Sequence, residues 1–313
     1  MAQALFVEFY ARARNQVLQK SDLPSDCIPT LPPFSADDAL NSDFLPRWAL
    51  GNLAGIVTLN LRRLDFAPLR GNLTLAQPLL WKIALNLRRS SMGDMISFKR
   101  PDGQSCQGYY VEPASGSTAP GIVVIQEWWG LNDQIKGVAD QLVQQGYRVL
   151  VPDLYRGEVT VEAAEAEHLM NDLDFGDAAT QNIRGAVQHL KVTSPKVAVL
   201  GYCMGGALTV LAAVYAPETD VAISWYGVPP AEAADVSTIA IPFQGHFAQQ
   251  DEFFPPDAVK AFEARLREGG VNYESYWYDA HHAFGNENND IYDPEATKLA
   301  WERSLTFLAS YLT

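Results

Sequence analysis

The stretch KVAVLGYCMGGALTVLAAVY, residues 196–215, decides the fold. Its first five residues form an apolar run of strand length, and the residues from Met204 onward are rich in Ala and Leu, which favour a helix. The glycines between them permit a sharp turn, because glycine adopts backbone angles that other residues avoid. The stretch therefore predicts a buried strand that turns directly into a helix.

The same alternation of strand and helix continues on both sides of this stretch. Apolar runs without polar alternation indicate strands covered on both faces, and they lie at Gly121–Ile125, Tyr147–Val151, Lys196–Leu200, Val221–Trp225, Ile239–Phe243 and Asn272–Tyr278. Helices are expected at Asn132–Gln145, Ala178–Lys191, Met204–Tyr215, Pro256–Glu268 and Pro294–Leu312. Two further β-like runs, Ile96–Lys99 and Gly108–Val111, come before them. We expect a mostly parallel, doubly wound α/β sheet whose functional residues follow the carboxyl ends of strands.

Cys203 occupies the turn itself, with Gly201 and Gly205 on either side. A nucleophile on such a strained turn projects into the site, and the next N–H, that of Met204, lies at a helix N-terminus where it can stabilise an oxyanion. The alternative is a small buried cysteine in a glycine-rich turn. The strand before and the helix after favour the nucleophile. Cys27 and Cys106 lack this context, and we interpret them as structural.

A cysteine nucleophile needs a base, and the base needs an orienting group. In this fold an acid and then a histidine follow the nucleophile along the chain. Asp251 and His282 come in that order after predicted strands, and we prefer His282 to its neighbour His281. One alternative is an acidic turn with packing histidines. Another is a metal site that includes His246, but the spacing is not that of a metal site, and we expect no metal.

Glu127 follows the first long parallel strand and precedes Trp128, Trp129 and Gly130. This position supplies the second oxyanion-hole donor in the architecture, so we expect the N–H of Trp128 to act with that of Met204. A carboxylate beside aromatic rings is poorly solvated, which predicts a perturbed pKa for Glu127. The alternative is a surface acid beside core tryptophans.

Taken together, these residues resemble the dienelactone hydrolase family of α/β-hydrolases, over approximately Met95 to Leu312. The resemblance rests on Gln126-Glu127-x-x-Gly130, Pro152-Asp153-Leu154-Tyr155, Gly201-Tyr202-Cys203-x-Gly205-Gly206, Trp225-Tyr226-Gly227, Asp251 with Pro255, and His282-Ala283-Phe284. It implies an α/β-hydrolase fold and a hydrolase that cleaves a lactone or small carboxylic ester, such as dienelactone, without metal or organic cofactor.

The resemblance also implies roles for particular residues. Cys203, His282 and Asp251 would form a triad that passes through an acyl-cysteine intermediate, and Glu127 would hold the thiol in the resting site until substrate displaces it. Well-known members bind a substrate carboxylate with arginines, one of them four residues after the histidine, where this chain has Asn286. We therefore expect a neutral or differently anchored substrate. Its pocket is predicted to include Trp129, Phe247, Phe253, Phe284 and Asn286.

Composition limits the partners and the location of the protein. Of 313 residues, 48% are hydrophobic and 19% charged, as expected of a chain with a core. A net charge of −14 argues against nucleic acid and anionic membrane surfaces as partners. Three cysteines without CxxC spacing fit a reduced compartment. No segment reaches the roughly 18 apolar residues of a membrane span, and the first residues do not resemble a signal peptide, so we expect a cytoplasmic protein.

Charge also divides the chain into two units. Residues 1–91 carry ten basic and seven acidic residues, whereas residues 92–313 have a net charge of −17. We expect an N-terminal extension over 1–91, helical or partly disordered, and a hydrolase domain over 92–313. The extension carries no chemical motif. It is interpreted as a small cap over the active site, as an arm, or as translated sequence upstream of a start at Met92.

Two other functions remain open at the level of sequence. One is a broader carboxylesterase or thioesterase of the same fold. The other is a non-catalytic binding or redox-sensing module, in which Cys203 is oxidised and the N-terminal unit recruits a partner. A full set of nucleophile, base, acid and oxyanion positions argues against the second. The sequence leaves open whether the protein is a monomer or a homodimer.

Overall fold

The computed structural model describes residues 93–113 and 118–312. The predictions made for residues 1–91 and for a start at Met92 lie outside this range. The described strands are β1 (Asp94–Lys99), β2 (Ser105–Val111), β3 (Gly121–Ile125), β4 (Arg148–Pro152), β5 (Val197–Tyr202), β6 (Val221–Trp225), β7 (Phe243–Gln250) and β8 (Tyr273–His281). The described helices are α4 (Asp133–Gln144), α5 (Ala163–Asp172), α6 (Phe175–Asp177), α7 (Arg184–Lys191), α8 (Met204–Tyr215), α9 (Pro256–Glu268) and α10 (Pro294–Leu312).

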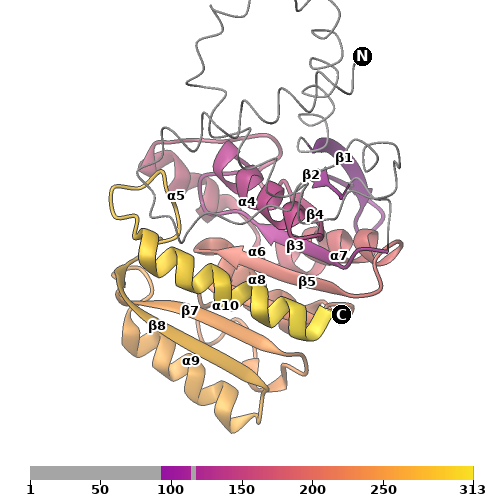
Figure 1. The fold of residues 1–313 in the computed structure, drawn as a ribbon. Helices are drawn as coiled ribbons and strands as arrows, with labels where there is room; N and C mark the ends of the chain where they lie inside the picture. The colour runs from indigo at the N-terminus through magenta and orange to yellow at the C-terminus, as the bar shows by residue number, and fades with distance from the viewer. Residues whose placement is uncertain (1–92, 114–117, 313) are drawn as a thin grey trace, which may run out of the picture. The chain divides into compact units, whose positions relative to one another are not determined.

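These strands form a single sheet within the described residues, in the order β1-β2-β4-β3-β5-β6-β7-β8. Strand β2 is antiparallel to β1 and β4, and the remaining neighbours are parallel. Figure 1 shows this sheet with helices packed against it. The predicted mostly parallel α/β sheet is confirmed, with a two-stranded hairpin at one edge.

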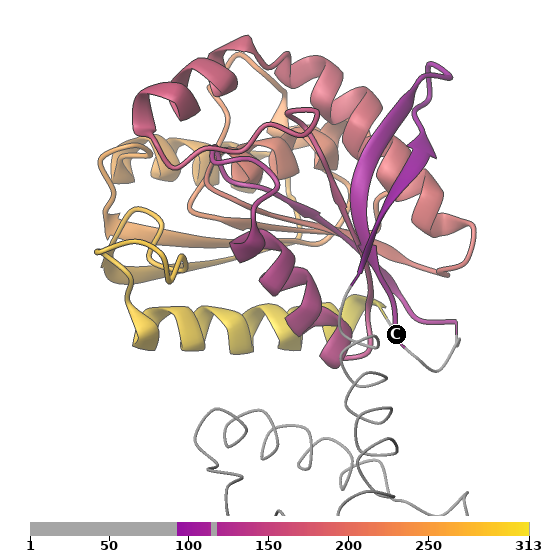
Figure 2. The same ribbon diagram turned by 90° about the horizontal axis from the view of Figure 1, so that it is seen from above.

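Two hydrophobic cores, one on each face of the sheet, explain why the central strands β3, β4, β5 and β6 are buried at every position, whereas the edge strand β8 is only partly buried and does not have the two-sided burial expected for Asn272–Tyr278. Along β3, Val123 and Ile125 face a core shared with α7, α8 and α9, whereas Ile122 and Val124 face a core shared with α4 and α10. Successive side chains of a strand point to opposite faces, so a strand with helices on both sides needs apolar residues at every position. Figure 2 shows α4 and α10 on one side of the sheet and the other helices on the opposite side.

The strand expected at Ile239–Phe243 is wrong in its position. Strand β7 begins at Phe243 and continues to Gln250. Pro242 has no N–H for a sheet ladder, and the N–H of Ile239 closes the short 3₁₀ helix η5 (Val236–Thr238) by bonding to the carbonyl of Val236. As a consequence, His246 lies within a buried strand rather than on a loop, and Asp251 directly follows that strand.

The helical region before β5 is also more complex than predicted. Of the helix expected at Ala178–Lys191, the first part is a π-helical segment, η4 (Ala178–Ile183), and the rest is α7. Helix α5 is not predicted from the sequence, and it buries only Ala166. A helix with so little buried surface has too weak an apolar periodicity to be recognised.

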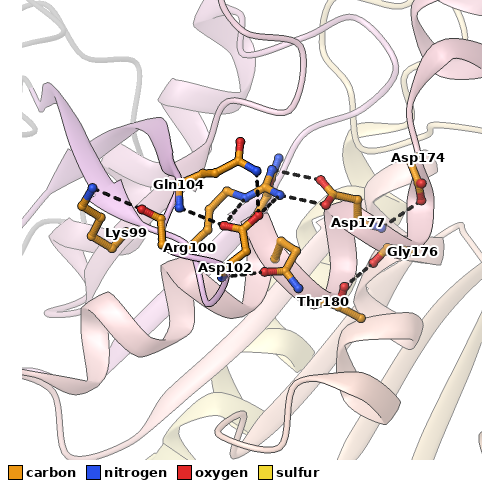
Figure 3. A network of polar contacts seen from close by, with 11 residues as sticks. Lys99, Arg100, Asp102, Gln104, Asp174, Gly176, Asp177 and Thr180 are labelled. Carbon is orange, nitrogen blue, oxygen red and sulfur yellow. Dashed lines mark hydrogen bonds and ion pairs between the residues drawn. The ribbon is translucent and has the colours of Figure 1, made fainter.

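Arg100, in the turn between β1 and β2, anchors the hairpin to this helical region (Figure 3). Its Nη2 lies 2.7 Å from Oδ2 of Asp102 and 2.8 Å from Oδ1 of Asp177. Its Nη1 donates to Oδ2 of Asp177 at 2.9 Å and to Oδ1 of Asn182 at 2.7 Å. We name Arg100, Asp102, Asp177 and Asn182 the anchor cluster. It joins segments almost eighty residues apart with charge-assisted hydrogen bonds.

Among the described helices, none combines the length and the apolar character that crossing a membrane requires. The cytoplasmic location remains a prediction.

Candidate active site

Cys203 lies at the turn between β5 and α8, in a backbone conformation that non-glycine residues rarely adopt. Its φ is 56° and its ψ is −119°. The conformation is held from both sides, because the N–H of Cys203 donates to the carbonyl of Trp225 at 3.0 Å and its carbonyl accepts from the N–H of Ala207 at 3.1 Å. Such strain costs of order 1–3 kcal/mol and persists only where the surroundings impose it. The turn directs the thiol away from the strand.

The glycines around Cys203 are required by close packing of the backbone. A Cβ atom at Gly201 would collide with the carbonyl of Gly205, and one at Gly205 would collide with the carbonyls of Ile125 and Gln126. The start of α8 therefore lies against the end of β3. This contact brings the N–H of Met204, whose position in the first turn leaves it without an intrahelical acceptor, near the segment that begins with Glu127.

His282 lies between Cys203 and Asp251. Its Nε2 is 3.1 Å from Sγ of Cys203, and its Nδ1 is 2.9 Å from Oδ2 of Asp251. Asp251 and His282 are buried and Cys203 is half-buried, whereas His281, the alternative base, is exposed. We name Cys203, His282 and Asp251 the thiol cluster. Its members come from the turn after β5, the residue after β7 and the residue after β8, which end at the same edge of the parallel sheet.

Asp251 is fixed on its other side by backbone donors. Its Oδ1 accepts the N–H groups of Phe253 at 2.9 Å and Phe254 at 2.8 Å. Burial lowers the pKa of His282, but the negative charge of the Cys203 sulfur and the hydrogen bond that Asp251 accepts from His282 outweigh it and raise that pKa to about 10. His282 therefore lies between the sulfur and a carboxylate, in the arrangement that lets a thiol transfer its proton to an imidazole.

Glu127 is buried beside the thiol cluster. Its Oε2 accepts from Nδ2 of Asn286 at 2.6 Å, and its Oε1 accepts from the hydroxyl of Tyr226 at 3.1 Å. Burial raises the pKa of Glu127, although the Asn286 bond, the charge of His282 and the Tyr226 bond act in the opposite direction. In the described part of the chain Glu127 makes no hydrogen bond with Cys203, so it does not hold the sulfur as the resemblance implies.

Tyr226 belongs to the site, although the motif Trp225-Tyr226-Gly227 gave it no role in the sequence. It is buried, has a φ of 40°, and its ring meets that of His282 edge to face at a centroid distance of 5.4 Å. The available signal was its position directly after β6, at the same sheet edge as the other site residues. Asn286, which the sequence predicts in the substrate pocket, donates to Glu127; its place in the pocket remains a prediction.

The aromatic residues expected in the pocket occupy two different places. Phe253 is 63% exposed, and its ring lies 4.9 Å from that of His282 and 6.1 Å from that of Trp128, which in turn lies 5.0 Å from Trp129. Phe284 is buried against Trp225 and Tyr226. Phe247 is buried against Phe262 and Trp277 in the core, which removes it from the candidate pocket.

His246 takes no part in the thiol cluster. Its Nδ1 lies 2.8 Å from the hydroxyl of Tyr278 and its Nε2 lies 2.9 Å from Oε1 of Gln244. Burial, together with the charge of Arg303, lowers its pKa to about 3, so it is a neutral core residue. Among the described residues, no group of three or more His, Cys, Asp and Glu side chains is placed to hold a metal ion.

A cavity of about 340 Å³ lies between β8 and α10. Its lining includes Tyr276, Arg303 and Tyr311 but no residue of the thiol cluster. The arrangement around Cys203, and not this cavity, has the features of a reactive site.

A parallel sheet with a reactive residue on a strained strand-to-helix turn defines the α/β-hydrolase class. The model of the dienelactone hydrolase family matches residues 106–312. The chain belongs to that family, and the expectation of a lactone or ester hydrolase with this fold is confirmed.

Individual relatives agree with the family assignment. "Protein usf" of Aquifex pyrophilus is 33% identical over 234 residues, which cover 71% of this chain and all of the relative. A protein of Aquifex aeolicus named "Putative carboxymethylenebutenolidase" is 31% identical over 233 residues, with the same coverage. Among solved structures, the dienelactone hydrolase-like promiscuous phosphotriesterase P91 from metagenomic libraries aligns with a TM-score of 0.62 over 71% of this chain and 100% of that one; at 22% identity this likeness concerns the fold.

Proposed function

We propose that the protein hydrolyses a neutral lactone or small carboxylic ester through an acyl-cysteine intermediate, with Cys203 as nucleophile, His282 as acid and base, and Asp251 as the residue that orients the imidazole. The observation that carries this proposal is the continuous series from sulfur to imidazole to carboxylate, with separations of 3.1 and 2.9 Å. Such a series on a nucleophile turn is the arrangement that acyl transfer requires.

In the first half of the reaction, the thiol proton resides on Nε2 of His282 and Sγ of Cys203 attacks the carbonyl carbon. The carbonyl oxygen becomes an oxyanion, for which we assign the N–H groups of Met204 and Trp128 as donors. The carbon–oxygen bond of the ester then breaks, and the leaving oxygen takes the proton from His282. For a lactone the alcohol remains attached to the acyl group.

In the second half, His282 takes a proton from water as the water oxygen attacks the thioester carbon. The carbon–sulfur bond breaks, the acid is released, and the proton returns to the Cys203–His282 pair. Asp251 keeps Nδ1 protonated throughout, so that Nε2 is free to exchange protons with the sulfur, the leaving oxygen and the water.

Charge supports a neutral substrate. Both hydrogen-bond donors to the buried Glu127 are neutral groups, from Asn286 and Tyr226, and residues 92–313 carry a net charge of −17. Such a site disfavours a second carboxylate. The exposed ring of Phe253 beside His282 offers apolar contact to the substrate instead. The division into an extension over 1–91 and a hydrolase domain over 92–313 remains part of this proposal.

The test is hydrolysis of p-nitrophenyl acetate and of a simple enol-lactone by wild type and by Cys203→Ala. We expect kcat to fall by at least roughly 10³-fold in the variant, because loss of a nucleophile removes the covalent route. Cys106→Ala is the matched control: that thiol is buried, and burial raises its pKa to about 11. Activity that survives in Cys203→Ala, or that disappears equally in Cys106→Ala, would contradict the proposal.

A further inference from the structure

The hydrogen bonds of Glu127 come from two separate loops. Asn286 follows β8, and Tyr226 follows β6, so the two donors approach the carboxyl group from different parts of the chain. Both donors are neutral groups. A buried carboxyl with both oxygens bonded in this way is held in one position, since leaving it would deprive the buried groups of Asn286 and Tyr226 of their partner.

Asn286 is itself fixed in orientation. Its Oδ1 accepts from the N–H of Asn288 at 3.0 Å, and its backbone N–H donates to the carbonyl of Ala283 at 3.0 Å. Because Oδ1 faces a backbone donor, the amide nitrogen must face the opposite way, toward Glu127. The turn therefore determines that Asn286 donates to Glu127.

Tyr226 is equally constrained. Its backbone has a φ of 40°, and its N–H donates to the carbonyl of His246 at 2.7 Å. These two features fix the position of its Cα atom. Its buried ring packs against His282 and Phe284. Burial raises the pKa of the Tyr226 hydroxyl, and the charges of Glu127 and Cys203 raise it further, so both groups lie near this tyrosine.

Among the residues that the structure describes, this arrangement leaves the sulfur of Cys203 with one hydrogen-bond partner. Cys203 bonds to His282, while Glu127 is occupied by Asn286 and Tyr226. If the Glu127 carboxylate turned toward the sulfur, it would accept a hydrogen bond from a protonated Cys203 thiol, and it would repel a Cys203 thiolate. Either interaction would weaken the pairing of Cys203 with His282.

We propose that Asn286 is a positioning residue that, with Tyr226, holds Glu127 away from Cys203, so that the thiol proton passes to His282 before any substrate binds. The inference rests on the proposed function, in which the Cys203–His282 pair performs catalysis. In this proposal the Cys203 thiolate forms in the enzyme without bound substrate. Formation of the thiolate then does not require a charged group on the substrate.

The test measures alkylation of Cys203 by iodoacetamide in the full chain without substrate, followed by peptide mass spectrometry from pH 5 to 9. The new carbon–sulfur bond displaces iodide and forms only from the thiolate, so the rate reports the Cys203–His282 pair directly. We expect wild type to react at a nearly constant rate between about pH 6 and 8, because the proton has already moved to His282.

Three variants complete the test. Asn286→Ala should slow alkylation at pH 7 by about tenfold, because Glu127 is released toward the sulfur. Glu127→Gln should react at least as fast as wild type, and Glu127→Gln in the Asn286→Ala background should restore the rate to within about twofold. Asn288→Ala, on the exposed part of the same loop, is the matched control and should behave as wild type.

Two results would overturn the inference. If Glu127→Gln slows alkylation tenfold or more, Glu127 is itself the group that takes the thiol proton. If Asn286→Ala leaves the rate and its pH profile unchanged, Asn286 does not position Glu127. If Asn286→Ala slows alkylation and the added Glu127→Gln does not restore it, the slowing comes from a folding defect and not from Glu127. Hydrolysis by Cys203→Ala is measured independently, so failure of the proposed function and failure of this inference give different results.

Discussion

The anchor cluster and the thiol cluster each join segments that are distant in the chain, but their polar groups are in different electrostatic environments. In the anchor cluster, hydrogen bonds to Asp102 raise the pKa of Arg100, and the same contact lowers the pKa of Asp102, so each charge supports the other. In the thiol cluster, Cys203 has a strained backbone, and the pKa of the adjacent Glu127 is raised by burial. The paired charges of the first cluster stabilise the folded protein. The strained backbone of Cys203 and the buried carboxyl of Glu127 are each unfavourable for folding.

The difference shows how this chain separates stability from chemistry. Charges at the hairpin are paired and partly solvated, which makes them useful for holding segments together. Groups at the sheet edge are buried with few compensating charges, an arrangement that is typical of functional sites. Substitutions in the anchor cluster should therefore change the free energy of unfolding and leave catalysis almost unchanged. Substitutions in the thiol cluster should do the reverse, and three experiments test this separation.

The largest expected effect is on catalysis. Asp251→Asn should lower kcat by roughly 10²- to 10⁴-fold, because the amide group donates to Nδ1 of His282 and imposes the wrong tautomer on the imidazole. Oδ1 of the asparagine still accepts from Phe253 and Phe254, so the midpoint of urea unfolding should remain near that of wild type. Steady-state hydrolysis and urea denaturation measure the two quantities. A stability loss as large as the catalytic loss would contradict the separation.

The next effect is on stability. Arg100→Ala should lower the free energy of unfolding by about 1–2 kcal/mol, since it leaves acceptors on Asp177 and Asn182 without their donor. Ester hydrolysis by the folded protein should stay within about twofold of wild type. Lys99→Ala, an exposed neighbour, is the control and should change stability by less than about 0.5 kcal/mol. Reduced kcat at full folding would mean that the hairpin influences the site.

The smallest effect concerns Glu127 and depends on pH. Burial raises the pKa of Glu127 in the folded protein above its pKa in the unfolded chain. Below the unfolded-state pKa the group is protonated in both states and the protein keeps its full stability. As pH rises through the folded-state pKa, that stability is lost. Glu127→Gln, which cannot ionise, should therefore be more stable than wild type by about 1 kcal/mol at pH 8. The gain should shrink to nothing near pH 4. A variant that is less stable at pH 8 would show that the carboxylate is favourable where it lies.

Much of the fold could be read from local patterns. Fully apolar runs predicted the parallel strands, and the glycines around Cys203 predicted the turn, because a single short segment contains all the information that either feature needs. The failures are also local in cause. Pro242 moved the start of β7, and helix α5 buries too little surface to produce a clear periodicity.

The sequence by itself determined the sheet, the turn that presents Cys203, and the chain order in which Asp251 and His282 follow it. Only the tertiary structure decided that His282 and not His281 faces the sulfur, that Phe247 belongs to the core, and that Glu127 bonds to Asn286, 159 positions away. Strand and turn patterns are set by neighbours in the chain, whereas these pairings depend on how distant loops converge at one edge of the sheet. No local pattern encodes that convergence.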